Sequence, residues 1–219
     1  MTECRPIVRT VACGAGFAGD RIDPAVKLAE SGRVDAIILE CLAERTLVPG
    51  LRARRNNPDN GADTRLWRRL KPLLGPARSN QCRVISNLGA ANPASAGRQI
   101  SPLATEEHCS GLHVAAVVGD DVLHLADRIR WDGSIHGDLL GAHAYLGTNG
   151  IVEAVNGKAD VIVTGRVADS ALFAADLIPY LDGSTEALAA AATVGHLLEC
   201  SGQITGGNFE GPGGASLGS

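Results

Sequence analysis

The stretch Ala159-Asp-Val-Ile-Val-Thr-Gly-Arg-Val-Ala-Asp-Ser-Ala-Leu172 joins a short apolar run directly to a helical pattern. Residues 161–163 are apolar throughout, which is typical of a strand buried on both faces, and Asp169 and Ser170 fall in the first turns of the following helix. In open α/β sheets, ligands bind outside the carboxyl ends of the strands. This strand end offers a ligand a glycine, the cation of Arg166, a carboxylate and a hydroxyl within six residues.

The rest of the chain alternates short apolar runs with longer helical patterns. The run Val114-Ala-Ala-Val-Val118 has no polar face, which indicates a parallel sheet covered by helices on both sides. We therefore predict an α/β fold: an open, mostly parallel sheet of about six strands, Rossmann-like and doubly wound, with helices on both faces. The expected strands cover residues 7–13, 35–40, 83–87, 113–118, 139–143 and 160–164. The expected helices cover residues 24–30, 43–55, 64–77, 93–104, 121–129, 150–156, 168–181 and 185–200.

Composition excludes several classes of function. The 219 residues contain 20 Lys and Arg against 24 Asp and Glu, a net charge of -4, so we expect no nucleic-acid partner. No apolar run reaches the length of a membrane span, and the N-terminus lacks the apolar segment of a secretion signal. We therefore expect a cytoplasmic protein that acts on a small-molecule substrate without binding membranes. The six cysteines form no CxxC pair, so we expect reduced thiols and assign no metal site and no resident cofactor.

Two further features concern the organisation of the chain. We expect residues 1–206 to form a single α/β domain, and the glycine-rich residues 207–219 to form a disordered tail that marks a candidate truncation point. Basic residues cluster in two groups: Arg52, Arg54 and Arg55, and then Arg65, Arg68, Arg69 and Lys71. We interpret these groups as a solvated helical face, and we keep an anion-binding patch as the less favoured alternative.

A second strand end carries a glycine-rich turn, Gly14-Ala-Gly-Phe-Ala-Gly19. It satisfies the GxGxxG pattern of dinucleotide sites, and Glu40 lies about 20 residues on, where a ribose-binding carboxylate would sit. However, Asp20 and Asp23 follow the glycines and would repel a pyrophosphate, and Pro24 starts the helix too late to present its N-terminus. We therefore favour a glycine turn that shapes another ligand pocket, with an NAD(P)-dependent oxidoreductase as the alternative.

Two more strand ends place polar side chains at the same edge. Asn87, within Ser86-Asn-Leu-Gly-Ala-Ala-Asn-Pro93, could orient a carbonyl or hydroxyl through its amide, whereas helix capping alone explains Asn92. Gly119-Asp-Asp121 sets two carboxylates after the next strand. They are equally compatible with holding a hard cation and, for Asp121, with capping a helix.

A helical segment near the end of the chain, Gly195-His-Leu-Leu-Glu-Cys200, carries a histidine, a carboxylate and a thiol on one face. His196 oriented by Glu199 could act as a general base or a metal ligand, although spacing alone favours a structural role. Asp169 and Ser170 also have a capping alternative, because both residue types favour the first turn of a helix.

Taken in order, the short motifs of this chain resemble the acyclic terpene utilisation family, AtuA type. The resemblance runs from about residue 9 to residue 209 and is most specific at residues 163–170 and 195–207. The motifs are Gly-x-Gly-Phe-x-Gly-Asp-Arg (14–21), Cys41-Leu-Ala-Glu44, Ser86-Asn87, Gly119-Asp-Asp121, Ala144-Tyr-Leu-Gly147, Val163-Thr-Gly-Arg-Val-Ala-Asp-Ser170, Gly195-His-Leu-Leu-Glu-Cys200 and Gln203-Ile-Thr-Gly-Gly207.

The resemblance implies a role in the breakdown of acyclic terpenoids such as citronellol and geraniol through coenzyme A thioesters. The family residues that carry over are Gly14, Gly16, Asp20, Glu44, Asn87, Asp120, Tyr145, Arg166, Asp169, His196 and Glu199. We assign proton transfer to three of these residues, Asp169, His196 and Glu199. We assign substrate binding to Gly14, Gly16, Asp20, Asn87, Asp120, Tyr145, Arg166 and Ser170.

The leading hypothesis is an enzyme, or the N-terminal part of one, that acts on or binds a branched acyl-coenzyme A. In it, Arg166 binds an anionic group, Asn87 orients a carbonyl, and His196 moves protons together with Asp169. Family members continue beyond the Thr-Gly-Gly motif, so one expectation is a missing C-terminal half. The other expectation is a homo-oligomer. A non-catalytic partner subunit or truncated relic is the remaining alternative.

Overall fold

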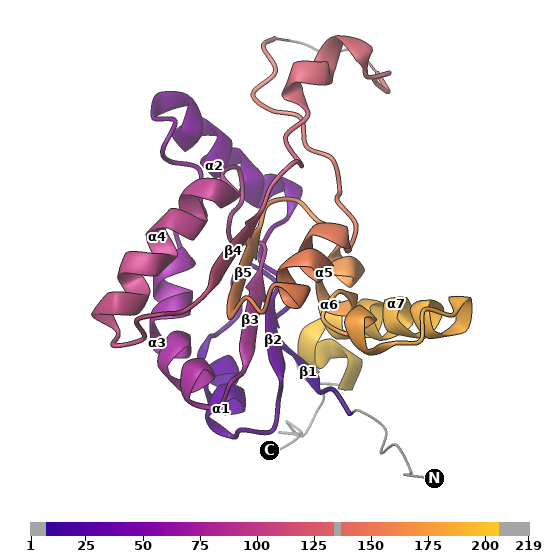
Figure 1. Cartoon of the computed structure of the whole chain (residues 1–219). Helices are drawn as coiled ribbons and strands as arrows, with labels where there is room; N and C mark the ends of the chain where they lie inside the picture. Colours follow the sequence, from indigo (N-terminus) through magenta and orange to yellow (C-terminus); the bar gives the residue numbers. More distant parts are fainter. Residues whose placement is uncertain (1–7, 134–136, 206–219) are drawn as a thin grey trace, which may run out of the picture.

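The computed structural model describes residues 8–133 and 137–205, which form a sheet with helices on both faces (Figure 1). The tail expected at residues 207–219 lies outside the described residues. The strands are β1 (Val11–Ala15), β2 (Ala36–Leu39), β3 (Arg83–Ser86), β4 (Val114–Val117) and β5 (Val161–Thr164). The α-helices are α1 (Asp23–Glu30), α2 (Glu44–Asn56), α3 (Leu66–Ser79), α4 (Pro93–Glu106), α5 (Asn149–Asn156), α6 (Asp169–Ala174) and α7 (Thr185–Glu199). The 3-10 helices are η1 (Leu123–Arg128), η2 (Ile178–Tyr180) and η3 (Ser201–Thr205).

The five strands are parallel and lie in the order β1-β2-β3-β5-β4. Their register places Ile38 beside Ile85, and Ile85 beside Ile162. Successive side chains in a strand point to opposite faces, so these three isoleucines line one face, while Ile37 and Leu39 line the other. All five side chains are buried. Burial on both faces explains why β2 and residues 161–163 of β5 are apolar throughout.

The strand order explains why helices cover both faces. The chain moves in one direction from β1 through β3 to β4 and then returns, so that β5 lies between β3 and β4. Because crossovers between parallel strands are right-handed, this reversal places α1, α3 and α4 on one face and α5 on the other (Figure 1). The predicted α/β, doubly wound fold is confirmed. The reversal also creates a switch point between the carboxyl ends of β3 and β5, where such folds bind ligands.

One expected strand does not form. Residues 139–143 belong to a segment that leaves β4 and projects away from the sheet before α5 (Figure 1). Among the described residues, this segment pairs only through isolated bridges, between Asp121 and His143 and between Leu146 and Val167. The mostly apolar residues 139–143 therefore have no strand beside them to pair with. The helix expected at 121–129 is the shorter η1.

The helix boundaries follow local chemistry. Asn92 caps α4 by accepting a hydrogen bond from the Ser95 N–H at 3.1 Å, and Ser184 caps α7 by accepting one from the Ala187 N–H at 3.2 Å. The helix expected at 168–181 is divided into α6 and η2. Pro179 lies within η2, and a proline cannot donate a hydrogen bond to a preceding turn.

Within residues 8–133 and 137–205, no helix combines the length and the apolar composition that crossing a membrane requires.

Candidate functional site

A pocket of about 260 Å³ lies at the carboxyl edge of the sheet. Its walls come from the loops after β1 and β2, the start of α6, and the turn between α7 and η3. The lining residues, which we call the carboxyl-edge pocket, are Gly16, Phe17, Asp20, Glu40, Asp169, Glu199, Cys200 and Ser201. Four of these eight residues are carboxylic acids, so the pocket is suited to proton transfer and to hydrogen-bonding hydroxyl groups.

The glycine turn after β1 forms one wall of this pocket. The Asp20 carboxylate accepts hydrogen bonds from the N–H groups of Gly16 at 2.7 Å and Phe17 at 3.2 Å. These are N–H groups that a dinucleotide pyrophosphate would need, and α1 begins only at Asp23. The turn therefore supports a pocket wall rather than the dinucleotide site of the alternative hypothesis.

The opposite wall packs closely against the same turn. A Cβ atom on Gly16 would lie 2.7 Å from the backbone oxygen of Glu199, so only glycine lets the end of α7 approach this closely. Helix α7 is held against α6 in a similar way, because a Cβ on Gly195 would collide with the backbone oxygen of Ser170. The C-terminal end of α7 therefore lies at the carboxyl edge of the sheet.

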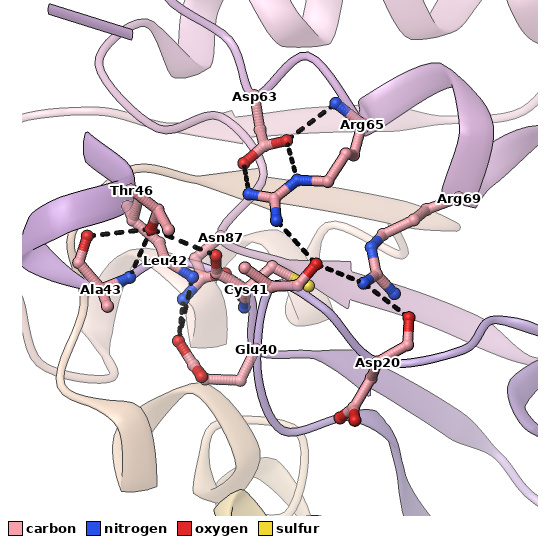
Figure 2. A network of polar contacts seen from close by, with 11 residues as sticks. Asp20, Glu40, Cys41, Leu42, Ala43, Thr46, Asp63, Arg65, Arg69 and Asn87 are labelled. Atoms are coloured by element: carbon pink, nitrogen blue, oxygen red, sulfur yellow. Dashed lines mark hydrogen bonds and ion pairs between the residues drawn. The ribbon is translucent and has the colours of Figure 1, made fainter. Parts of the chain in front are cut away.

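Glu40 is a buried carboxylate at the end of β2 (Figure 2). Its Oε1 accepts a hydrogen bond from the Asn87 side-chain amide at 2.8 Å and another from the Leu42 N–H at 3.1 Å. Asn87 in turn accepts a hydrogen bond from the Cys41 N–H at 2.7 Å. Asn87 therefore connects the ends of β2 and β3 and orients Glu40, and its amide is already engaged by protein groups.

Burial changes the acidity of two pocket carboxyls. Burial raises the pKa of Glu40 from 4.5 to about 7, and the charge of Asp169 adds to the effect, whereas the Asn87 hydrogen bond opposes it. Burial also raises the pKa of Asp169, against the lowering effect of Arg166. The Oδ1 atom of Asp169 is buried and has no hydrogen-bond partner among the described residues. Glu40 is therefore able to hold a proton near neutral pH, and Asp169 keeps its proton to a higher pH than an exposed aspartate does.

His196 and Glu199 of α7 pair with each other at the rim of the carboxyl-edge pocket. The Nδ1 atom of His196 lies 2.8 Å from Glu199, but the His196 side chain is 73% exposed, whereas that of Glu199 is 18% exposed. Glu199 lines the pocket and His196 does not. The predicted pairing of the two side chains is therefore observed, with the carboxylate on the pocket side.

Arg166 forms a separate polar cluster outside the lining of the carboxyl-edge pocket. Its guanidinium donates hydrogen bonds to the Leu42 backbone oxygen, to Glu44 at 2.8 Å and to the Tyr145 hydroxyl. It also stacks on the Tyr145 ring at 4.2 Å, and Tyr145 donates a hydrogen bond to Glu44. The guanidinium that we predicted to bind an anionic ligand therefore already donates to protein groups. In this structure Arg166 holds the loops after β2 and β5 together.

Asp120 anchors the same loop from the side of β4. Its Oδ2 accepts a hydrogen bond from the Arg166 N–H at 2.8 Å and lies 2.8 Å from Nδ1 of His143. A Cβ on Gly165 would collide with this carboxylate, so the glycine permits the contact. Asp121, by contrast, accepts hydrogen bonds from Leu123 and Arg54, as a turn residue would.

The structure brings together only part of the predicted site. Gly16, Asp20, Asp169 and Glu199 line the carboxyl-edge pocket. Gly14 packs instead between β2 and α1, where a Cβ would lie 2.6 Å from Ile37. The remaining predicted residues lie outside the pocket lining: Asn87, Asp120, Tyr145, Arg166, Ser170 and His196.

Sequence reasoning gave Glu40 a role only in the dinucleotide alternative and gave His143 none. The available signal for Glu40 was a carboxylate directly after a fully apolar strand. His143 gave no local signal, because its partner Asp120 is 23 residues away in the chain.

The described residues contain no group of three or more His, Cys, Asp or Glu side chains placed to hold a metal ion. The chain matches the family described as "Acyclic terpene utilisation family protein AtuA" over residues 9–218. Searches of curated proteins and of solved structures found no significant match. Because the family match covers nearly the whole chain, the protein belongs to the acyclic terpene utilisation family, AtuA type.

Proposed function

We propose that this protein binds a branched acyl-coenzyme A thioester derived from an acyclic terpenoid and transfers protons on its acyl part in the carboxyl-edge pocket. Membership of the acyclic terpene utilisation family supports a role in the use of such compounds. Terpenoid carboxylic acids are commonly handled as thioesters, because a thioester carbonyl acidifies the neighbouring carbon. The protein in this proposal is a cytoplasmic enzyme.

One observation carries the proposal: two carboxyls with raised pKa values, Glu40 and Asp169, line one pocket. A general base works best when its pKa lies near the working pH, and the pKa of about 7 at Glu40 meets this condition. Asn87 fixes the Glu40 side chain, so it acts as a positioning residue. The charge of Asp169 also helps to raise the pKa of Glu40, and carboxyls paired in this way recur in acid and base roles.

The proposed step assigns one role to each carboxyl. The Glu40 carboxylate removes a proton from the carbon next to the thioester carbonyl, so that a C–H bond breaks and an O–H bond forms on Glu40. In this step Asp169 takes up a proton from solvent as the bound thioester excludes water from the pocket, and its acid form then donates a hydrogen bond to the carbonyl oxygen, where negative charge develops. Return of a proton from Glu40 to carbon completes the cycle. A proton exchanged with solvent before this return leaves a measurable isotope label.

Citronellyl-coenzyme A tests the proposal in two measurements. We expect the thioester to raise the unfolding temperature of the protein, and we expect deuterium from D2O to enter the carbon next to the carbonyl. Free coenzyme A serves as the control for binding through the nucleotide end alone. A protein that neither shifts in unfolding temperature nor incorporates deuterium would contradict the proposed function.

A further inference from the structure

A second cavity, of about 310 Å³, lies on the other side of the glycine turn. Its lining residues, which we call the arginine pocket, are Ala18, Gly19, Asp20, Arg21, Ile22, Arg65, Arg68 and Arg69. Four of the eight residues are arginines, and three of these come from the start of α3. Its volume lies at the lower end of the range of small-molecule sites, which is roughly 300–1,000 Å³.

Two of the four arginines are neutralised by carboxylates. Arg21 forms a two-point pair with the exposed Asp23. Arg65 forms a two-point pair with the buried Asp63, with contacts of 2.8 Å and 2.5 Å. The pair of Arg65 is partly buried, that of Arg21 is exposed, and neither pair involves the other two arginines.

Arg69 is the most unusual of the four, because it is 4% exposed and has no carboxylate partner among the described residues. Its Nη2 donates to the backbone oxygens of Ala18 at 2.8 Å and Asp20 at 2.9 Å, and its Nη1 is buried without a partner. A buried, unpaired charge is costly in a folded protein. The described residues therefore provide no anion to pair with the Arg69 guanidinium.

The acidic side chain of the turn does not meet this need. The Asp20 carboxylate is bound to the N–H groups of Gly16 and Phe17, and Figure 2 shows it pointing away from the Arg69 guanidinium. Arg68, the fourth arginine, is exposed and has no ion pair in the described part of the chain. Among the described residues, Arg68 and Arg69 therefore line the arginine pocket without a carboxylate partner.

We infer that the arginine pocket binds a phosphate group. Guanidinium groups form two-point, charge-assisted hydrogen bonds with phosphate oxygens, and the first turn of α3 adds the partial positive charge of a helix N-terminus. The sequence interpretation of this basic cluster as a solvated helical face is wrong for Arg65 and Arg69, which are held against the glycine turn.

The site has a structural connection to the carboxyl-edge pocket. Arg65 and Arg69 both donate to the backbone oxygen of Ala18, at 2.6 Å and 2.8 Å, and Asp20 lines both cavities. A phosphate on the arginines would therefore stabilise the turn that forms a wall of the carboxyl-edge pocket. The source of the phosphate is either the free ion or the phosphate end of a coenzyme A thioester, and only the second source rests on the proposed function.

Isothermal titration with inorganic phosphate tests the inference, with potassium chloride at equal ionic strength as the reference. We expect phosphate to bind with a dissociation constant of about 1 mM or lower, and we expect chloride to give no comparable binding heat. Arg69→Lys keeps the charge but loses the planar fork, and should weaken phosphate binding about tenfold. Because Arg69 also holds the turn, exposed Arg68→Gln is measured in parallel and should weaken binding roughly threefold.

Arg33→Gln is the matched control, because it removes one exposed arginine between α1 and β2, outside the arginine pocket. Equal affinity in the wild type, Arg68→Gln and Arg69→Lys, or no phosphate binding beyond the chloride response, would overturn the inference. Coenzyme A and its form without the 3′-phosphate distinguish the two sources. If phosphate binds and coenzyme A does not, the arginine pocket is a free-phosphate site, and the proposed function is then decided by citronellyl-coenzyme A alone.

Discussion

The side-chain amide of Asn87 donates a hydrogen bond of 2.8 Å to the carboxylate of Glu40, and this contact links the carboxyl ends of β3 and β2. Glu40 would otherwise be a buried acid held only by the Leu42 N–H. The same amide also receives the Cys41 N–H, so one side chain satisfies two neighbouring groups. The orientation of the proposed base therefore depends on a residue that lies outside the pocket lining.

Replacement of this amide should destabilise the fold. Asn87→Ala removes partners from the buried Cys41 N–H and from Glu40, so we expect the free energy of unfolding to fall by about 1–3 kcal/mol. Chemical denaturation measures this change. Asn156→Ala, at an exposed asparagine that ends α5, is the control and should change stability by less than about 0.5 kcal/mol. Equal effects of the two substitutions would show that the contact with Glu40 contributes nothing.

Glu40 should make stability depend on pH. Its pKa of about 7 in the folded protein exceeds its ordinary value of 4.5, so the folded chain binds this proton more tightly than the unfolded chain. The resulting stability is present below pH 4.5 and is lost as the pH rises through about 7.

Glu40→Gln should remove this dependence while keeping an oxygen that accepts from Asn87. Between pH 5 and pH 8, we expect the wild type to lose roughly 1–3 kcal/mol of stability relative to this variant. Denaturation curves at several pH values measure the difference. Parallel pH profiles of the two proteins would mean that Glu40 titrates normally.

Arg166 should act through structure rather than by binding an anion. Arg166→Lys cannot keep the contacts to Leu42 and Glu44 together with the stacking on Tyr145, so we expect a loss of about 1–2 kcal/mol in unfolding free energy. Its affinity for citronellyl-coenzyme A should stay within about threefold of the wild type.

Arg45→Lys, at an exposed position of α2, provides the control for the exchange of residue type. If Arg166→Lys folds with unchanged stability but no longer binds the thioester, the result would support the hypothesis that Arg166 binds an anionic group of the ligand.

Helix α7 packs so closely against α6 that a methyl group at position 195 should destabilise the fold. Gly195→Ala places a Cβ against the backbone oxygen of Ser170, and we expect a loss of about 1–3 kcal/mol. Gly75→Ala is the matched control, because a Cβ there meets nothing within 4 Å and should stabilise α3 by about 0.5–1 kcal/mol. Thermal unfolding of both variants compares them, and a neutral Gly195→Ala would show that α7 can shift.

The sequence was sufficient for the fold because the decisive signals are local. Apolar runs such as 114–118 and 161–163 differ clearly from the helical patterns between them, and parallel strands bring their carboxyl ends to one edge. The prediction of a strand at 139–143 is wrong because pairing depends on a neighbouring strand, which a short apolar run alone does not supply.

The candidate site was predicted less completely, because its key contacts are remote in sequence. Asp169 and Glu199 could be expected from their positions in helices near the edge, and both line the pocket. The burial of Arg69 depends on carbonyls about 50 residues earlier in the chain, which no helical pattern reveals. Asn87 was assigned to a ligand because its partner Glu40, 47 residues away, was assigned to a different function.

Deuterium incorporation from D2O into citronellyl-coenzyme A, compared among four proteins, tests the central claim most directly. Glu40→Gln and Asp169→Asn each remove a proposed proton-transferring or hydrogen-bonding group, and we expect each to slow exchange by about a hundredfold or more. His196→Gln changes a 73% exposed side chain outside the pocket lining and should keep the wild-type rate within about threefold. Exchange that survives both carboxyl substitutions, or that is lost in folded His196→Gln alone, would contradict the account.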